Sequence, residues 1–186
     1  MTGYPAQYGA LLRETFARVD WNQVEQVIEW FRAARDEGRR IFVCGNGGSA
    51  ATAAHFVCDM VKGASYEFPR RFRITALTEG ISTITAYAND AGYDVIFAEQ
   101  LKNFAEPGDL LLALSGSGNS PNVVRAMEYA NQAGLKTIAF TGKDGGRLGP
   151  LAQLEITVPA PHMGRIEDAH MVLCHMVAYY FMDTRE

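Results

Sequence analysis

The sequence predicts a single α/β domain in which a mostly parallel sheet of about five strands lies between helices. Short apolar runs of strand length alternate along the chain with longer stretches of helical periodicity, which is typical of a parallel sheet with helical crossovers. The 186 residues, 48% hydrophobic and 20% charged, are enough for one domain with a sizeable core. The expected strands are Arg40–Gly45, Arg73–Thr78, Leu110–Leu114, Lys136–Thr141 and Leu154–Val158.

Two helices are predicted ahead of the first strand, over Gln7–Arg18 and Trp21–Asp36, because apolar residues recur there at helical spacing. Asp20 is a typical N-cap for the second helix and Gly38 a typical stop signal. We expect residues 1–38 to pack on the core and to form an oligomer interface. Residues 39–186 then form the main part of one structural domain.

The first strand leads directly into a turn rich in glycine, with Gly45, Gly47 and Gly48 followed by Ser49 as a helix cap. The letters also satisfy the loose dinucleotide pattern G-x-G-x-x-A. That pattern requires an acidic residue at the end of the second strand, and Asp59 instead falls inside the predicted helix. The sequence therefore disfavours a nicotinamide cofactor.

A second loop of this kind follows the strand Leu110–Leu114. Gly116 and Gly118 let the backbone turn tightly and approach a ligand, and Pro121 suits the first turn of the helix that follows. A helix N-terminus presents free N–H groups and the positive end of the helix dipole. We therefore interpret this loop as a phosphate-binding cradle with three hydroxyl groups, from Ser115, Ser117 and Ser120.

The remaining segments contain fewer residues that are candidates for a chemical role. The stretch after Thr78 is helical and is interrupted near Asn89–Gly92, where Asn89 and Asp90 are expected in a turn. Residues 159–164 read as a loop, and Arg165 to Met182 as a long closing helix.

Four ionisable residues on two predicted helices are candidates for chemistry. His55 and Asp59 are four residues apart, and Glu167 and His175 are eight apart, so each pair can share one helix face. Two histidines and two carboxylates can serve as general acid and base or as ligands of a divalent metal such as zinc. The alternative is that both histidines are core residues with satisfied hydrogen bonds. That second interpretation applies more strongly to two other histidines, His162 and His170.

Composition excludes several classes of partner. The net charge of −4 gives no basic surface for nucleic acid, and no segment offers the roughly 20 apolar residues of a membrane span. The N-terminal residues have neither a basic nor an apolar region of a secretory leader, so we expect a cytoplasmic protein. The cysteines Cys44, Cys58 and Cys174 lie in apolar patterns and are expected to be buried, reduced thiols.

Five segments in the same order resemble the sugar isomerase (SIS) domain family, specifically its phosphoheptose isomerases. They are GNGGSAATAAHF (45–56), AYANDAGYDVIF (86–97), SGSGNSPNVVRAM (115–127), TGKDGG (141–146) and RIEDAHMVLCH (165–175). The resemblance runs from about Ile41 to His175, and it implies that residues 39–186 form an SIS domain.

The resemblance also implies a function: isomerisation of sedoheptulose 7-phosphate to D-glycero-D-manno-heptose 7-phosphate through an enediol, the first step of heptose biosynthesis. It implies a homotetramer with sites at subunit interfaces, Asp59 as the base and His175 as its acid/base partner. Zinc would be held by His55, Asp59, Glu167 and His175. The implied substrate-binding residues are Asn46, Gly47, Gly48, Ser49, Asn89, Asp90, Ser115, Gly116, Ser117, Ser120 and Glu167.

The chain departs from the family pattern at several of these positions. Asp59 stands where the family usually has Glu, and Glu167 where it usually has Gln. Gly116 replaces a common Thr, and the arginine expected shortly after position 59 is absent, although Lys62, Arg70 or Arg71 can substitute.

Two other functions stay open at this point. One is isomerisation of a different, shorter sugar phosphate. The other is a non-catalytic binding module of the kind found in replication-initiator-associating relatives, which typically lack the second histidine. The presence of His55, Asp59 and His175 together favours an enzyme.

Overall fold

The computed structural model describes residues 3–185 and contains a five-stranded sheet in the order β2-β1-β3-β4-β5. The neighbouring strands all pair in parallel, as predicted, with Ile41 opposite Leu110 and Leu110 opposite Lys136. The predicted ranges 1–38 and 39–186 include Met1, Thr2 and Glu186, which lie outside the described residues. The strands are β1 (Arg40–Gly45), β2 (Arg73–Ala76), β3 (Leu110–Ser115), β4 (Lys136–Gly142) and β5 (Leu154–Val158).

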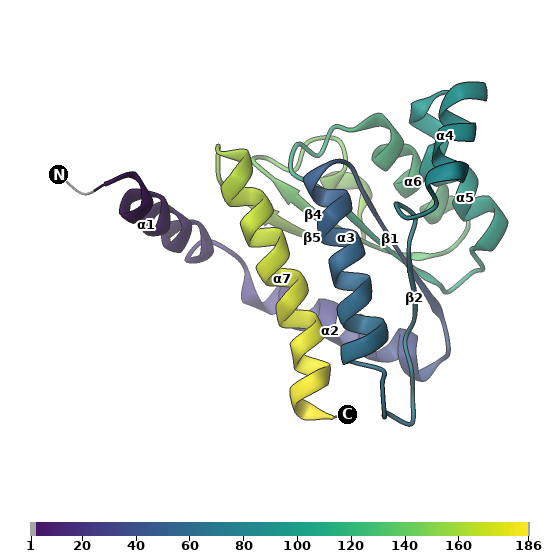
Figure 1. Cartoon of the computed structure of the whole chain (residues 1–186), viewed down its shortest axis with the longest axis horizontal. Coiled ribbons are helices and arrows are strands. Elements are labelled where there is room, and N and C mark those ends of the chain that lie inside the picture. Colours follow the sequence, from purple (N-terminus) through teal and green to yellow (C-terminus); the bar gives the residue numbers. More distant parts are fainter. Residues whose placement is uncertain (1–2, 186) are drawn as a thin grey trace.

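Helices cover both faces of the sheet. One face carries α2 (Trp21–Asp36), α3 (Gly48–Cys58) and α7 (Met163–Thr184), and α3 lies beside α7 in Figure 1. The opposite face carries α5 (Ile96–Phe104) and α6 (Pro121–Gln132). The other helical elements are α1 (Tyr4–Phe16), η1 (Asp59–Gly63), α4 (Ile81–Asp90), η2 (Tyr93–Val95) and η3 (Gly149–Leu151).

The alternation of side chains along each strand divides the core into two clusters. Along β3, Leu110, Leu112 and Leu114 face the α2–α3–α7 cluster, while Leu111 and Ala113 face the α5–α6 cluster. Because both faces are covered, the strand is apolar at nearly every position, as a central parallel strand requires. This is why an uninterrupted run of apolar residues identified β3 in the sequence.

Two helices contribute little to this core. Within α1, Thr15 is the buried residue, and the helix extends away from the sheet with Tyr4 exposed. The Tyr8 hydroxyl donates a hydrogen bond of 2.6 Å to Asp168 and so ties α1 to α7. No residue of α4 is buried, and Ile81 at its start is 73% exposed. Both helices therefore have faces that this chain leaves uncovered.

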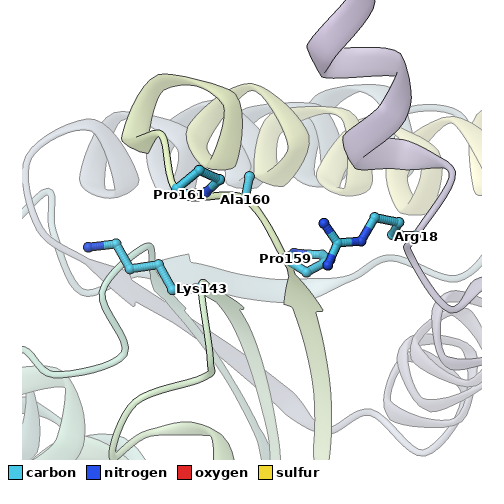
Figure 2. Close-up of a pocket in the computed structure, with 5 residues that line it drawn as sticks. All are labelled: Arg18, Lys143, Pro159, Ala160 and Pro161. Atoms are coloured by element: carbon cyan, nitrogen blue, oxygen red, sulfur yellow. The ribbon is translucent and has the colours of Figure 1, made fainter.

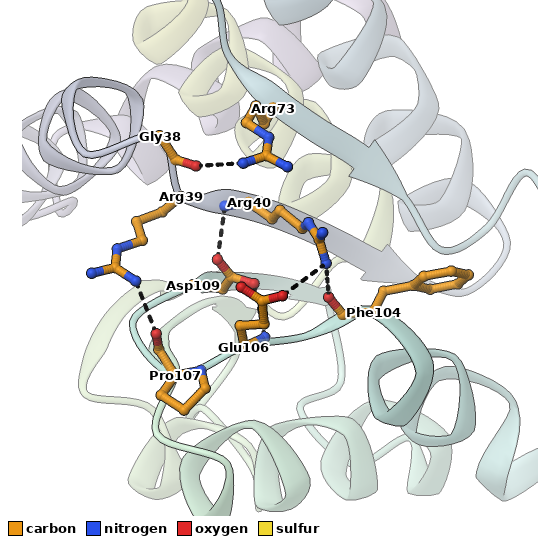
Figure 3. Close-up of polar contacts among 8 residues, drawn as sticks. All are labelled: Gly38, Arg39, Arg40, Arg73, Phe104, Glu106, Pro107 and Asp109. Carbon is orange, nitrogen blue, oxygen red and sulfur yellow. Dashed lines mark hydrogen bonds and ion pairs between the residues drawn. The ribbon is translucent and has the colours of Figure 1, made fainter.

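The amino-terminal edge of the sheet is closed by polar contacts (Figure 3). The buried carboxylate of Asp109 accepts hydrogen bonds from the backbone N–H of Arg40 at 2.8 Å and of Glu106 at 2.9 Å. Nearby, Arg39 donates to the Pro107 carbonyl and Arg73 to the Gly38 carbonyl. These bonds fix the starts of β1 and β3. The opposite edge, at the carboxyl ends of the strands, is left for loops that bind ligands, and it is the edge at which α/β sheets bind their ligands.

A π-helical turn, η1, follows α3 where the sequence predicts a continuous helix. Its signature is a hydrogen bond of 2.9 Å from the Ala64 N–H to the carbonyl of Asp59, five residues earlier. Gly63 closes the turn against Met182 of α7, where a Cβ atom would lie only 2.1 Å from the Met182 Cε. The close approach of α7 thus accompanies the wide π-helical turn. Asp59 is the first residue of this turn.

The cysteine prediction is confirmed for Cys44 and Cys174, which are buried, and is wrong for Cys58, which is exposed. Cys58 is the last residue of α3 and follows the buried Val57, so a rotation of about 100° per residue turns it toward solvent. Burial raises the pKa of the Cys44 thiol to about 12, so that it stays protonated at neutral pH. No helix in the part of the chain that the structure describes is both long and apolar enough to cross a membrane.

His170 is a buried core histidine, as predicted, whereas the same prediction is wrong for His162, which lies in the loop before α7 and is exposed. The His170 Nε2 donates a hydrogen bond of 2.9 Å to the carbonyl of Thr141, and its Nδ1 has no hydrogen-bond partner. Burial lowers the pKa of His170 from its ordinary value of 6.5 to about 4, so the folded protein keeps this ring neutral.

This neutral ring predicts a loss of stability in acid. The unfolded chain takes up a proton at His170 below about pH 6.5 and the folded chain only near pH 4, so its contribution is complete above pH 6.5. Between those values it is lost at up to about 1.4 kcal/mol per pH unit. Denaturant unfolding from pH 7 to 4.5 should therefore give a flatter pH dependence for His170→Gln than for the wild type. The exposed His162→Gln variant should follow the wild type, and equal slopes in all three proteins would contradict this assignment.

Candidate functional site

The two predicted ligand loops meet in one pocket of about 260 Å³ at the carboxyl edge of the sheet. The β1–α3 loop supplies one wall, the β3–α6 loop the other, and the start of α7 closes the end. The structure thus brings together nine of the residues that the sequence predicts to bind substrate. They are Asn46, Gly47, Gly48, Ser49, Ser115, Gly116, Ser117, Ser120 and Glu167, with Leu114 and Met163 as further lining residues.

Apart from Glu167, the polar groups that line this pocket are neutral and include several hydrogen-bond donors. The N-termini of α3 and α6, with the positive ends of their helix dipoles, border the pocket, although the Ser49 and Val123 N–H groups already donate to the Asn46 and Ser120 carbonyls. The Ser115 Oγ accepts from the Gly118 N–H at 3.1 Å, and the Ser117 Oγ accepts from the Asn119 N–H at 3.2 Å. Each hydroxyl is thereby fixed as an acceptor and keeps its own proton for a ligand. Such a site suits a phosphate group.

Glycine is required where α3 begins, because Glu167 of α7 lies against Gly48. A Cβ atom at position 48 would lie 2.7 Å from the Glu167 Oε1. The carboxylate therefore sits at the N-terminus of α3, where the helix dipole favours a negative charge. No lysine or arginine lines the pocket, so a bound anion would meet Glu167 as its one charged neighbour among the lining residues.

The second site is a cluster further along the same two helices. The Nε2 atoms of His55 and His175 are 3.0 Å apart, and the Asp59 Oδ2 lies 3.3 Å from the first and 3.6 Å from the second. His55 and Asp59 share one face of the α3–η1 helix, as their spacing predicts, and His175 comes from the neighbouring α7. The packing of α3 on α7 therefore assembles the cluster.

These atoms are suited to hold a metal ion. The Asp59 Oδ2 is buried and has no aligned hydrogen-bond donor, which is unfavourable unless a ligand completes it. Three atoms around a tetrahedral zinc with bonds of about 2.0–2.2 Å lie about 3.3–3.5 Å apart, close to the observed separations. The group whose ligand atoms lie within 4.8 Å of one another comprises His55, Asp59 and His175 among the described residues. Glu167 stands outside it, against Gly48, and its assignment as a fourth ligand stays a prediction.

Asn89 and Asp90 lie away from the serine pocket. They are the last residues of α4, and the Asn89 Nδ2 donates a hydrogen bond of 2.7 Å to the Asp90 Oδ1. Asp90 lines a different hollow of about 560 Å³ on the uncovered face of α4, with Ser82, Thr83, Ala86, Tyr87 and Ala91. Within this chain the structure does not bring Asp90 into contact with the phosphate cradle.

Sequence reasoning missed two residues at the pocket, Asn122 and Tyr93. Asn122 exchanges two side-chain hydrogen bonds with Asn46, and the Tyr93 hydroxyl donates to the same Asn46. A polar residue directly after Pro121, in the first turn of a helix, was the available signal for Asn122. Tyr93 had none, because its contact joins segments 47 residues apart.

A larger hollow of about 450 Å³ lies between the end of β5 and the segment after α1, lined by Arg18, Lys143, Pro159, Ala160 and Pro161. Figure 2 shows its two cations toward opposite ends, with the Lys143 side chain extending away from Arg18. Ligand sites usually have polar groups that converge on one point. The smaller serine pocket has that convergence, so we assign the ligand-binding role to it.

Comparison with known proteins agrees with this geometry. The SIS domain family matches residues 3–142. A phosphoheptose isomerase from Chlorobaculum parvum is 38% identical over 174 residues, which cover 91% of this chain and 82% of that protein. One from Mycobacterium tuberculosis is 41% identical over 154 residues, covering 83% of this chain and 76% of that protein.

Solved structures lead to the same family. The phosphoheptose isomerase from Neisseria gonorrhoeae superposes with a TM-score of 0.85 at 30% identity, over 96% of this chain and 98% of that one. The enzyme from Francisella tularensis superposes with a TM-score of 0.87 at 27% identity, over 98% of this chain and 100% of that one. This chain therefore belongs to the SIS domain family and, within it, to the phosphoheptose isomerases.

Proposed function

We propose that the protein is an aldose–ketose isomerase that converts sedoheptulose 7-phosphate to D-glycero-D-manno-heptose 7-phosphate. One observation carries this proposal: a phosphate cradle and an Asp–His cluster lie along the same pair of packed helices. Anchoring the phosphate at one end would orient the reacting carbons at the other, which is how remote binding energy contributes to catalysis.

The distance between the two sites supports a seven-carbon substrate. Ser49 at the cradle and His55 in the cluster are six residues apart on α3, or about 9 Å along the helix axis. An extended heptose 7-phosphate spans about 10 Å from C1 to phosphorus, at about 1.2 Å for each of about eight bonds. A three-carbon sugar phosphate would reach only about half as far.

The chemistry requires a base and an acid at C1 and C2. We assign the base to the Asp59 carboxylate, which would take the proton from C1, and the acid to His175, which would protonate the carbonyl oxygen at C2. Loss of the proton from the C1 hydroxyl and return of a proton to C2 complete the transfer through an enediol. Positioned acid and base groups contribute about 10²–10⁴-fold to the rate of such proton transfers.

We further propose that the cluster holds one zinc ion per subunit, with His55, Asp59 and His175 as ligands and Glu167 as the fourth. When bound, the ion would stabilise negative charge on the sugar oxygens. The unpartnered Asp59 oxygen and the two facing imidazoles support this assignment. In the same proposal Glu167 borders both sites, so its carboxylate would also meet the sugar.

We propose that the enzyme is a homotetramer with its active sites at subunit interfaces. The uncovered faces of α1 and α4 support this, since apolar residues such as Tyr4 and Ile81 are exposed on them. Asp90 faces the hollow on α4 instead of its own cradle. An interface at that hollow would let Asp90 contact the sugar hydroxyls of a site shared between subunits.

The first prediction concerns turnover. Purified protein should convert sedoheptulose 7-phosphate to the aldose heptose phosphate, and Asp59→Asn and His175→Gln should each lower kcat by about 10²-fold or more. Asp59→Glu keeps a carboxylate and should retain activity, as should the exposed His162→Gln. Product is measured by chromatography, and thermal melting checks the fold. Full activity of Asp59→Asn and His175→Gln would disprove the catalytic assignment.

The second prediction concerns the metal. Titration calorimetry of metal-stripped protein should show one Zn²⁺ bound per chain, and Asp59→Asn or His55→Ala should weaken binding by at least about tenfold. Glu167→Gln separates the two arrangements of ligands. A weakened affinity in this variant supports Glu167 as a ligand, and an unchanged affinity limits the site to the three clustered residues. Equal zinc affinity in all variants would reject the site.

The third prediction concerns assembly. Ile81→Asp places a charge on the uncovered face of α4 and should dissociate the tetramer, because burying an unpaired carboxylate in an interface is unfavourable. Light scattering after size exclusion would measure the mass. Phe104→Asp, at another exposed apolar position at the end of α5, is the control and should leave the tetramer intact. A monomeric wild type would refute the proposal.

A further inference from the structure

The amide side chain of Asn46 joins the two loops of the phosphate cradle. Its Nδ2 donates a hydrogen bond of 2.8 Å to the Asn122 Oδ1, and the Asn122 Nδ2 returns one of 2.8 Å to the Asn46 Oδ1. The Tyr93 hydroxyl lies 3.0 Å from the same Asn46 Oδ1. Asn122 is 1% exposed, so this pairing lies beneath the pocket and Asn46 itself forms part of its wall.

One backbone group determines the orientation of the whole set. The Val123 N–H can only donate, and it is shared between the Ser120 carbonyl at 3.1 Å and the Asn122 Oδ1 at 3.0 Å; an amide nitrogen in place of that oxygen would set two donors against each other, so the facing atom is the oxygen. The Asn122 Nδ2 then faces Asn46, whose facing atom must accept and is therefore Oδ1. The Asn46 Nδ2 consequently faces the Asn122 Oδ1, and the Tyr93 hydroxyl has to donate.

The hydrogen-bonding capacity that remains on Asn46 is a single proton. Its Oδ1 has two lone pairs, and they are taken by the Asn122 amide and the Tyr93 hydroxyl. Its Nδ2 has two protons, and one goes to the Asn122 Oδ1. The other is the one hydrogen-bonding group of this side chain left for a ligand. Asn46 can therefore donate to a bound oxygen atom but cannot accept from a hydroxyl.

We propose that Asn122, assisted by Tyr93, is a positioning residue that fixes Asn46 as a donor to an oxygen of the substrate phosphate. This inference rests on the proposed function, since it assigns a role within the same cradle. A freely rotating asparagine would present its oxygen as often as its nitrogen, and an oxygen would repel an anion. The pairing removes that alternative before the substrate arrives.

An ion pair anchors Tyr93 independently of Asn46. The Asp94 Oδ2 lies 2.7 Å from the Arg125 guanidinium, which joins η2 to α6 one turn beyond Asn122. The tyrosine is thus held over the cradle by its neighbour in the chain. Tyr93 lies three residues after Asp90, the last residue of α4, so the end of α4 is fixed relative to the cradle as well.

The test is Asn122→Asp, a nearly isosteric change. A carboxylate sets an acceptor against the Asn46 Oδ1 in either orientation of that amide, so the hydrogen bond from Asn122 is lost and replaced by a repulsive contact, and neither orientation of Asn46 is then held. KM for sedoheptulose 7-phosphate and the dissociation constant for inorganic phosphate should both rise about tenfold or more, with kcat within about threefold of wild type. Asn122→Leu, which adds no charge, should raise both constants in the same direction.

Asn131→Asp is the matched control on the same helix. Asn131 also makes two side-chain hydrogen bonds, to the Leu151 carbonyl and from the Thr137 hydroxyl, but lines neither site. This variant should lose stability without a change in KM or in phosphate affinity. Adding Asn122→Asp to Asn46→Ala should raise KM no further, because both residues act through one donor.

The outcomes separate the two proposals. If Asn122→Asp melts lower and keeps wild-type KM and phosphate affinity, as Asn131→Asp should, Asn122 is purely structural and this inference is wrong. If the wild type binds phosphate but does not turn over the heptose phosphate, the proposed function fails while a weakened phosphate affinity in Asn122→Asp upholds the inference. If the wild type does not bind phosphate, both proposals are overturned.

Discussion

The packing of α3 against α7 is the contact on which both sites depend. Both helices begin at the carboxyl edge of the sheet, beside the serine loop, and run away from it together. At their start, Gly48 meets Glu167, and about two turns further along, His55 and Asp59 meet His175. The glycine at position 48 permits the close approach at one end, and Gly63 permits it at the other. A change in the separation or register of these helices would therefore disturb the cradle and the cluster at the same time.

The two edges of the sheet differ: the amino edge is made rigid by hydrogen bonds, and the carboxyl edge carries the loops of the candidate binding site. At the amino edge, Asp109 and the surrounding arginines satisfy backbone groups with direct hydrogen bonds. At the carboxyl edge, the loops contact each other so closely that a Cβ atom on Gly118 would lie 2.0 Å from the Gly145 carbonyl oxygen. The ligand loops are short and braced by neighbouring loops. Substrate binding would therefore require little ordering of the chain.

The fold could be predicted from the sequence because its main signals are local. The runs of apolar residues in β1, β3, β4 and β5 mark buried strands, and the glycines and serines after β1 and β3 mark the turns. Placing these turns at one edge of a parallel sheet also predicts the pocket. The spacing of His55 and Asp59 predicts a shared helix face, and the structure places them as expected.

The features that could not be predicted depend on contacts between distant segments. The π-turn at Asp59 accompanies the approach of Met182, and nothing in its own five residues indicates it. The pairing of Asn46 with Asn122 joins residues that are 76 positions apart. The exposure of Cys58 depends on where α3 ends relative to its neighbours. Likewise, the sequence around Asp90 does not indicate that this residue lines a separate hollow on α4.

The absence of lysine and arginine from the lining of the cradle has a consequence for how substrate arrives. In a chain with a net charge of −4, a sugar phosphate approaches without long-range attraction from the pocket, and Glu167 adds a local repulsion. Encounter rates should then depend weakly on ionic strength, unlike those of enzymes that collect anions with basic clefts. Under the proposed function, selection would take place on contact, where each phosphate oxygen would meet a hydroxyl or N–H donor of fixed direction. Differences in affinity between ligands would then lie in the rate at which they leave more than in the rate at which they are captured.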